Sequence, residues 1–272
     1  MTADADRERF QSGARDYAAY LDTPEGRLRL DLAFASLQEF LPQSTRSLRA
    51  LDLGCGTAAT AVRLARLDVH VTLLDSSPAM LEIAERTAQK AGVSDRVTLR
   101  QGDAAQAEEL FAEELFDVVL CHNVLEYVER PDAVLRQSAR LMRRDSPALL
   151  SILVRSRSGE VLKSALKAGD LELAEQTLDA SWGHESLYGG RVRLFTSDEL
   201  TSMLKAVGLK LIAVRGVRVV ADYLPPQISR EAEYQRVFEL ERKLGQRPEF
   251  AAIARYTHYL ARCASPMGED AA

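Results

Sequence analysis

The most informative stretch of this 272-residue sequence reads Leu51-Asp52-Leu53-Gly54-Cys55-Gly56-Thr57-Ala58. A short apolar run ends there and a helical pattern begins, so the glycines fall in a turn between a strand and a helix. Glycines at such a turn let the backbone approach a ligand closely, beside the positive end of a helix dipole. Because Ala58 stands where a third glycine is common, the turn alone is a weak signal.

Asp75 supplies a second signal, because it ends the next apolar run, 19 residues after Gly56. An acid at that place accepts hydrogen bonds from the hydroxyls of a ribose. The alternative is that Asp75 only caps the helix expected to begin at Pro78. Asp52, before the glycines, argues against a nicotinamide enzyme, whose turn usually begins with a glycine. Together the turn and Asp75 predict a ligand that contains a ribose.

Short apolar runs alternate with segments of helical period on both sides of this turn. Strands are expected at 48–53, 69–74, 96–100, 116–121 and 148–154, and helices at 57–67, 78–91 and 131–142. Strands that are continuously apolar are typical of a parallel sheet covered on both faces. Farther on we expect a helix at 196–207, capped by Thr196 or Ser197 and ended by Gly208, then a strand at 209–220, a helix at 232–244 and a last strand at 254–262.

Composition and charge exclude several classes of protein. The chain has 46% hydrophobic and 28% charged residues and a formal net charge of −5, which is typical of a globular protein and not of a globally basic nucleic-acid binder. Residues 1–129 hold 13 Lys/Arg against 22 Asp/Glu, and residues 130–272 hold 22 against 18, so a basic face on the second half stays open. The three cysteines have no metal-ligand spacing, and no leader or membrane-spanning run is visible, so we expect a cytoplasmic protein without metal or membrane.

Four segments, taken in order, resemble the class I S-adenosylmethionine-dependent methyltransferases. They are Leu51–Thr57, Leu73–Leu81, Gly102–Ala104 and Phe116–Val119. The resemblance implies an α/β fold with a seven-stranded Rossmann-like sheet and S-adenosyl-L-methionine as cofactor. It also implies which residues lie against that cofactor: Gly54, Cys55 and Gly56 at the methionine moiety, Asp75 at the ribose, and Asp103, Ala104 and Ala105 at the adenine.

Further segments resemble the bacterial tRNA 5-carboxymethoxyuridine methyltransferases, over about Phe10 to Ala264. They are Thr23–Arg29, Cys121–Tyr127, Gly216–Leu224 and Ala254–His258. This resemblance implies tRNA modification, with the tRNA anticodon loop as partner and a methyl ester on the wobble uridine as product. It also implies that Arg29 and His122 contact the methyl donor. The competing interpretation is methylation of a small-molecule acid or hydroxyl, because the chain is acidic overall and the segment 182–191 replaces a lysine-rich stretch of that family.

A carboxylate acceptor is already ionised at neutral pH, so the enzyme needs no general base and we assign no catalytic residue. An arginine would bind and orient the carboxylate. The candidates for substrate binding are Arg155, Arg193, Arg218 and Arg255, with Arg215 as a further one. For His122 we favour packing against the cofactor over a role as base or a purely structural role, and we expect His258 to be structural.

The pattern divides the chain into five parts. Residues 1–44 form an N-terminal helical cover, 45–154 the cofactor-binding core, 155–195 a helical lid or substrate insertion after strand five, 196–264 the last part of the core, and 265–272 a tail. Tyr20, near Arg29, could close over the carboxylate end of the donor or simply pack. Trp182, in the insertion, is expected to anchor the lid, and the alternative is a platform on which a base stacks.

Overall fold

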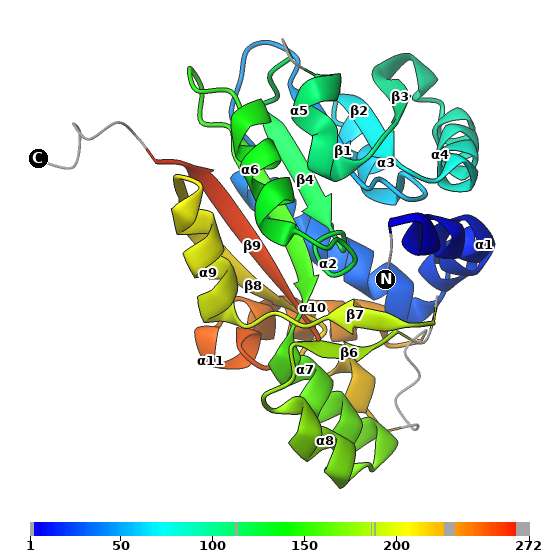
Figure 1. The fold of residues 1–272 in the computed structure, drawn as a ribbon, viewed down its shortest axis with the longest axis vertical. Coiled ribbons are helices and arrows are strands. Elements are labelled where there is room, and N and C mark those ends of the chain that lie inside the picture. The colour runs from blue at the N-terminus through cyan, green and yellow to red at the C-terminus, as the bar shows by residue number, and fades with distance from the viewer. Residues whose placement is uncertain (1–2, 112–113, 186, 188, 226–231, 265–272) are drawn as a thin grey trace, which may run out of the picture.

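The computed structural model describes residues 3–111, 114–185, 187, 189–225 and 232–264 (Figure 1). Its centre is a seven-stranded sheet in the order β3-β2-β1-β4-β5-β9-β8. The first five strands are parallel to one another: β1 (Arg49–Leu53), β2 (His70–Asp75), β3 (Val97–Gln101), β4 (Val118–His122) and β5 (Leu149–Arg155). The last strand, β9 (Tyr256–Cys263), lies between β5 and β8 (Leu209–Val217) and runs antiparallel to both. The predicted seven-stranded α/β sheet is confirmed.

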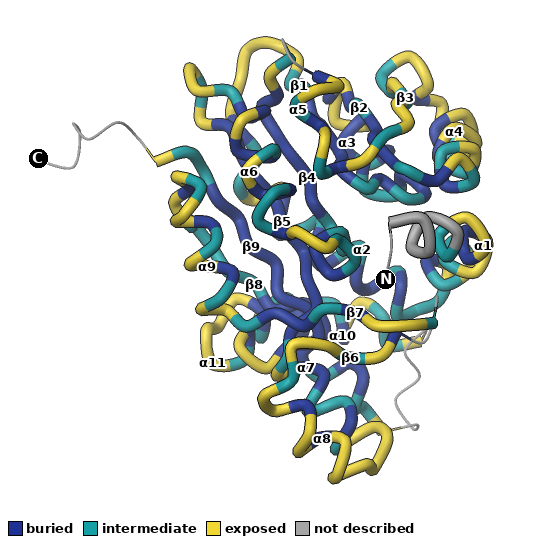
Figure 2. The backbone as a smooth tube through the Cα atoms, in the orientation of Figure 1, coloured by how far each residue is buried: buried dark blue, intermediate teal, exposed yellow. Residues whose placement is uncertain are grey.

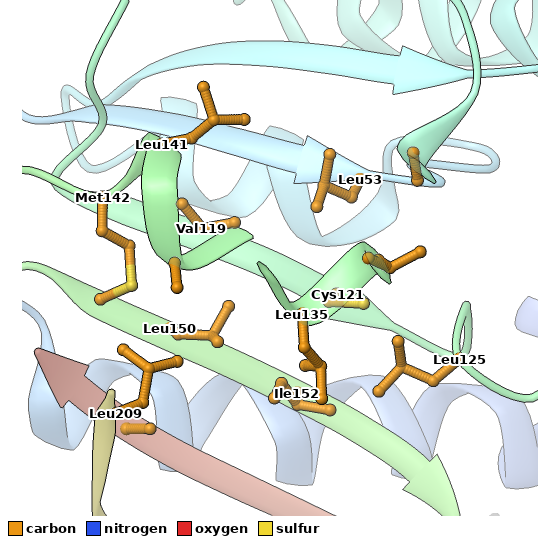
Figure 3. Close-up of a cluster of buried hydrophobic side chains, with 14 of the residues drawn as sticks. Leu53, Val119, Cys121, Leu125, Leu135, Leu141, Met142, Leu150, Ile152 and Leu209 are labelled. Carbon is orange, nitrogen blue, oxygen red and sulfur yellow. The ribbon is translucent and has the colours of Figure 1, made fainter. Parts of the chain in front are cut away.

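Helices cover both faces of the sheet because successive strand residues point to opposite sides. On one face Leu53, Cys121 and Ile152 pack against α6 (Pro131–Leu141) and α9 (Ser197–Ala206), and Figure 3 shows several of these side chains. On the other face Leu73 and Leu120 pack against α2 (Pro24–Phe40), α3 (Ala59–Ala65) and α4 (Pro78–Ala91). The central strands β4 and β5 are accordingly buried along almost their whole length (Figure 2).

The ends of the helices follow the capping residues in the sequence. Ser77 accepts a hydrogen bond from the backbone N–H of Met80 and begins α4, with Pro78 at its first position. Thr196 caps α9 in the same way, and Gly208 follows that helix with a φ of +76°, as expected. Because Ser77 caps α4, the alternative interpretation of Asp75 as the cap is wrong.

Two predicted elements are too long because the backbone turns left-handed inside them. The helix expected from residue 57 begins only at Ala59, since Ala58 has a φ of +62°. The strand expected to reach residue 220 ends at Val217, since Arg218 also has a φ of +62°. A side chain other than glycine rarely adopts this conformation, and nothing in the sequence at either position signals it.

The insertion after β5 is not entirely helical, so that prediction is wrong in part. It begins with α7 (Arg157–Leu162), a π-helical segment (Lys163–Ala168) and α8 (Leu171–Thr177). A two-stranded hairpin follows, made of β6 (Trp182–His184) and β7 (Arg191–Arg193). The helical part projects from the body of the molecule at the bottom of Figure 1.

The remaining elements complete the ends of the sheet. Before β1 the chain forms α1 (Ala3–Leu21) and α2, and α1 lies beside α4 (Figure 1). The short α5 (Ala107–Leu110) lies near α6, and α10 (Tyr234–Gly245) and α11 (Pro248–Ala251) pack on β8. Within the described residues no helix is long and apolar enough to cross a membrane, and no group of His, Cys, Asp or Glu is arranged to hold a metal ion. The predicted tail, 265–272, lies outside the described residues.

Candidate active site

A cavity of about 1040 Å³ opens at the carboxyl edge of the parallel strands. The ends of β2 and β4 contribute Asp75 and His122 to its wall, and the loops after β1 and β3 contribute Gly54 and Asp103. Ligands of open α/β sheets bind at this edge, where the strand order reverses, and here β1 is the point of reversal. The cavity therefore lies where the fold directs a ligand.

The turn after β1 lines the cavity with two glycines, so its backbone there is not covered by side chains of its own. Gly54 and Gly56 both have a positive φ, +62° and +52°. A Cβ atom on Gly54 would lie 2.6 Å from Cγ2 of Val124, and one on Gly56 would lie 3.3 Å from the ring of Tyr17. The turn therefore needs glycine at both positions for its conformation, and Gly54 also for its packing.

Asp75 is held by the same turn. Its carboxylate accepts hydrogen bonds from the backbone N–H of Gly56 and of Ser77, each at 2.9 Å. Burial raises the pKa of Asp75, although these N–H groups act to lower it. Each oxygen has one such bond, so lone pairs remain for the hydroxyls of a ribose.

The loop after β3 forms the wall next to Asp75. Asp103 accepts a hydrogen bond from the N–H of Ala105 at 2.8 Å and so fixes a short 3₁₀ turn, Ala104–Gln106. Asp103, Ala104 and Ala105 all line the cavity, as does Gly56. Cys55 does not: it is buried and lines a second cavity of about 40 Å³ together with Asp52. Burial and the nearby Asp75 raise the pKa of Asp52 to about 8, so this carboxyl is protonated at neutral pH.

Arg29 joins the N-terminal helices to the cavity. Its Nη2 donates to the hydroxyl of Tyr17 at 3.0 Å, and its Cζ lies 5.1 Å from the ring centroid of Tyr20. His122 lines the same cavity, and burial, reinforced by the charge of Arg29, lowers the pKa of His122 to about 3. Its imidazole is therefore neutral at physiological pH.

Four guanidinium groups in the cavity lining surround Tyr256. The Cζ atoms of Arg29, Arg155, Arg218 and Arg255 lie 5.5, 5.9, 5.8 and 5.8 Å from the ring centroid of Tyr256. Burial alone would raise the pKa of Tyr256, but the four positive charges outweigh it and lower that pKa to about 7. We call these four arginines and Tyr256 the arginine wall.

The sheet register explains why these arginines converge. Tyr256 is the first residue of β9 and is paired with Arg155, the last residue of β5, on one side. On the other side it is paired with Val217, the last residue of β8, so Arg218 follows at the same height. Arg155, Arg218 and Arg255 were predicted from the sequence as substrate-binding residues, and the structure brings all three together.

Three buried carboxylates hold the arginine wall in place. Glu185 forms an ion pair with Arg155, Glu160 with Arg255, and Asp222 with Arg218. Burial would raise the pKa of each of these acids, but the neighbouring cations hold all three below their ordinary range. Two lysines of the π-helical segment also line the cavity, Lys163 and Lys167.

Arg193, also predicted as a substrate-binding residue, is not part of this group. It does not line the cavity, and its Nη2 forms an ion pair with Glu199 at 2.6 Å. Arg215 pairs with Glu39 at 3.3 Å, also away from the cavity. Trp182 is 41% exposed, with Arg191 over its ring at 4.5 Å, so it is not a buried anchor of the insertion.

Sequence reasoning missed the partners of the arginines and the phenol at their centre. Tyr256 fell within the predicted last strand but was not singled out, and neither were Glu160, Glu185 and Asp222. Tyr127, whose hydroxyl donates to Glu185 at 3.0 Å, was missed as well. A usable signal was the place of Tyr256 at the start of a strand, one residue after a candidate arginine.

Comparisons with known proteins agree with this geometry. A family model described as "Methyltransferase domain" matches residues 44–208. The tRNA 5-carboxymethoxyuridine methyltransferase of Escherichia coli K12 is 27% identical over 256 residues, which cover 91% of this chain and 92% of that protein. The ubiquinone biosynthesis O-methyltransferase of Methylocella silvestris is 38% identical over 89 residues, or 33% of each chain.

Solved structures share the fold at low sequence identity. A methyltransferase of Thermotoga maritima, described as a possible histamine N-methyltransferase, superposes with a TM-score of 0.63 at 15% identity and covers 95% of this chain and 100% of its own. The magnesium protoporphyrin IX methyltransferase of Synechocystis PCC 6803 with bound S-adenosylhomocysteine superposes with a TM-score of 0.62 at 16% identity, covering 97% and 100%.

Proposed function

The chain belongs to the methyltransferase-domain family, and from that premise we propose that it methylates the carboxylate of 5-carboxymethoxyuridine at the tRNA wobble position, with S-adenosylmethionine as donor. The observation that carries the choice of acceptor is the cluster of Arg155, Arg218 and Arg255 around Tyr256 in the cavity lining. The relative that matches nearly the whole chain, at 27% identity, has the same activity in its name.

The residues at the glycine turn suit the proposed donor. Gly54 and Gly56 leave room for an extended chain, Asp75 has lone pairs for two ribose hydroxyls, and the loop at Asp103–Ala105 would flank the adenine. Arg29 and His122 would bind the amino-acid end. Cys55 would support the turn from behind, without lining the cavity.

Methyl transfer to a carboxylate would require the protein mainly to position the carboxylate against the methyl group of the donor. The donor supplies an electrophilic methyl group, and a carboxylate is a ready nucleophile at neutral pH. Arg155, Arg218 and Arg255 would bind the carboxylate and exclude water from it, which aligns the attacking oxygen. Their own carboxylate partners hold the guanidiniums in position before the acceptor arrives, so less ordering is left for the binding step.

The charge around the arginine wall favours an acceptor with more than one negative charge. Four arginines and Lys163 and Lys167 face three carboxylates there, although the whole chain is acidic. A nucleotide that bears a carboxylate carries both that group and its phosphates. With a tRNA acceptor, the proposal includes a location in the cytoplasm.

A second candidate is methylation of a small-molecule acid. The specific observation in its favour is that the insertion carries exposed acids, among them Glu172 and Glu175 in α8, which would repel an RNA backbone. This helix packs on the π-helical segment whose lysines line the cavity. A small acid would meet the same arginine wall without touching this surface.

Nucleoside mass spectrometry after incubation with S-adenosylmethionine distinguishes the two. The substrate is tRNA that bears unmethylated 5-carboxymethoxyuridine, and the control is the same tRNA with 5-methoxyuridine, which lacks the carboxylate. We expect one added methyl on the first tRNA and none on the second. If the first tRNA is not methylated although the protein still binds S-adenosylhomocysteine, the tRNA acceptor is contradicted and a small acid becomes the proposed acceptor.

A further inference from the structure

Two histidines and a serine form a hydrogen-bonded row that leads from the cavity wall into the sheet. Nε2 of His122 lies 2.8 Å from Oγ of Ser151, and the same hydroxyl lies 2.7 Å from Nε2 of His258. The three residues come from β4, β5 and β9, which are neighbours in the sheet. The ring centroids of His122 and His258 are 5.3 Å apart, and the two ring planes are nearly perpendicular. Neither Ser151 nor His258 has a role in the binding of donor or acceptor described above.

The single proton of the hydroxyl couples the two rings. A serine can donate only one hydrogen bond, so Ser151 donates to one histidine and accepts from the other. The nitrogen that donates to Ser151 must carry a proton, and the nitrogen that accepts from Ser151 must not. His122 and His258 therefore have opposite tautomers as long as both are neutral.

Both rings are neutral at physiological pH. Burial, with a smaller contribution from Arg29, lowers the pKa of His122 to about 3. Burial also lowers the pKa of His258 well below its ordinary range, helped by His122 and Arg215. An imidazolium, which would donate from both nitrogens, is thus not formed at either position.

The surroundings of His258 determine which of the two histidines donates a hydrogen bond to Ser151 and which accepts one. Its Nδ1 is buried and has no hydrogen-bond partner in the described part of the chain. A proton on Nδ1 would be a buried donor without an acceptor, and such orphaned N–H groups are rarer than lone pairs left unfilled. His258 therefore carries its proton on Nε2 and donates to Ser151, and Ser151 donates to Nε2 of His122.

We infer that Ser151 and His258 hold His122 in the tautomer with the proton on Nδ1, so that His122 offers the cavity a hydrogen-bond donor and not a base. Ser151 and His258 are then positioning residues that act through His122. The group that faces His122 must supply an oxygen lone pair, as a carboxylate or a carbonyl does. A hydroxyl that has to lose its proton would find no base there. The inference concerns the protein alone and holds whichever acceptor is used.

Imidazole ¹⁵N NMR tests the inference without any substrate. The chain has four histidines, and a His→Asn variant at each of positions 70, 122, 184 and 258 assigns the signals. At pH 7.5 we expect the proton of His122 on Nδ1 and that of His258 on Nε2. In Ser151→Ala the ratio of the two tautomers of His122 should shift about fivefold toward Nε2–H, because the hydrogen bond that selects Nδ1–H is lost.

Ser138→Ala is the matched control. Ser138 is equally buried and donates to the backbone carbonyl of Val134 at 2.8 Å, in α6 and away from the row. It should leave the tautomer of His122 unchanged, which separates the effect of the row from that of losing any buried hydroxyl. A proton on Nε2 of His122 in the wild-type protein would overturn the inference, as would a Ser151→Ala spectrum in which His122 is unaltered.

Discussion

Gly54 shows how a single residue serves both the fold and the site. Its φ of +62° is one that other residues avoid, and a Cβ atom there would lie 2.6 Å from Val124. Gly54→Ala should therefore cost about 1–2 kcal/mol in strain and also displace Val124 from the cavity wall. We expect a lower melting temperature and binding of S-adenosylhomocysteine weakened by about tenfold or more, measured by calorimetry.

Gly92→Ala is the control for that experiment. Gly92 has a φ of +69°, but nothing lies within 4 Å of the position its Cβ would take. This variant should lose a similar amount of conformational stability and bind the ligand normally. If both variants bind S-adenosylhomocysteine like the wild-type protein, the glycine turn does not form the donor site.

Tyr256 gives the arginine wall a dependence on pH. Its folded-state pKa of about 7 lies below the ordinary value of 10, so between pH 7 and pH 10 the unfolded chain binds more protons at this group than the folded chain. The stabilisation from its ionisation therefore grows as pH rises through that window, and is lost as pH falls through 7. The free energy of unfolding of the wild-type protein, relative to Tyr256→Phe, should increase from pH 6.5 to pH 9.5.

The same ionisation should oppose acceptor binding, because a phenolate competes with a carboxylate for the guanidiniums. We expect KM for the acceptor to rise above pH 7 in the wild-type protein and to rise less in Tyr256→Phe. Tyr223→Phe is the control, since burial and the nearby Asp222 raise the pKa of Tyr223 to about 12 and keep it protonated. Identical pH profiles for the wild-type protein and Tyr256→Phe would contradict this role.

At the scale of residues, the sequence was a good guide to side chains that follow a strand and a poor one to their partners. Arg155 directly follows the predicted strand 148–154, so its position at the sheet edge could be anticipated. Arg218 lay inside the predicted strand 209–220, and only its left-handed φ brings it to the same edge. Arg193 was a candidate from the predicted insertion, yet it belongs to the hairpin and pairs with Glu199. Glu160 and Glu185 meet the arginines from distant parts of the chain, which no local pattern encodes.

The turn after β8 depends on one helix. The carboxylate of Glu241, in α10, is buried and accepts three backbone N–H bonds, from Val219, Val220 and Ala221, at 2.6, 2.8 and 2.6 Å. These bonds fix the chain directly after Arg218, whose φ of +62° is strained. The helix can come this close because it meets the strand at Gly245 and Gly216, where a Cβ on Gly245 would lie 2.1 Å from the carbonyl oxygen of Gly216.

Glu241→Gln should therefore disturb Arg218 although it does not touch the cavity. The amide group would place N–H donors against backbone N–H groups, at a cost of about 1–3 kcal/mol. We expect a raised KM for the acceptor and normal affinity for S-adenosylhomocysteine. Glu239→Gln, on the exposed side of the same helix, should change neither. A KM that stays at the wild-type value in Glu241→Gln would show that the turn holds Arg218 without this clamp.

Among the elements, the strands and most helices could be predicted because the hydrophobic period and the capping residues are features of the local sequence. The hairpin β6–β7 could not, since its strands have three residues each and both ends of β6 are exposed. The position of β9 between β5 and β8 was also beyond the sequence pattern, because strand order depends on packing between segments about 100 residues apart.

For the whole molecule the net charge is negative, whereas the cavity is lined by a cluster of positively charged side chains. The chain carries −5 overall, yet residues 130–272 hold 22 Lys/Arg against 18 Asp/Glu. If tRNA binds over that half, its association constant should fall steeply with salt, with a slope of the logarithm of that constant against log[salt] on the order of −2 to −4, as for a few phosphate contacts. Binding of S-adenosylhomocysteine should change little over the same range. A tRNA slope no steeper than that of S-adenosylhomocysteine would favour a small acid.

If the methyl group is transferred to a carboxylate oxygen, the product is an ester, and its stability to alkali distinguishes it from an ether or a methylated base. Radiolabelled methyl from S-adenosylmethionine should be incorporated into tRNA bearing 5-carboxymethoxyuridine and then released as methanol by mild alkali, because an ester hydrolyses under conditions that leave ethers and methylated bases intact. Label that stays in the tRNA after alkali would contradict transfer to a carboxylate oxygen, since the acceptor would then be a hydroxyl or a ring atom and the arginine wall would have another purpose.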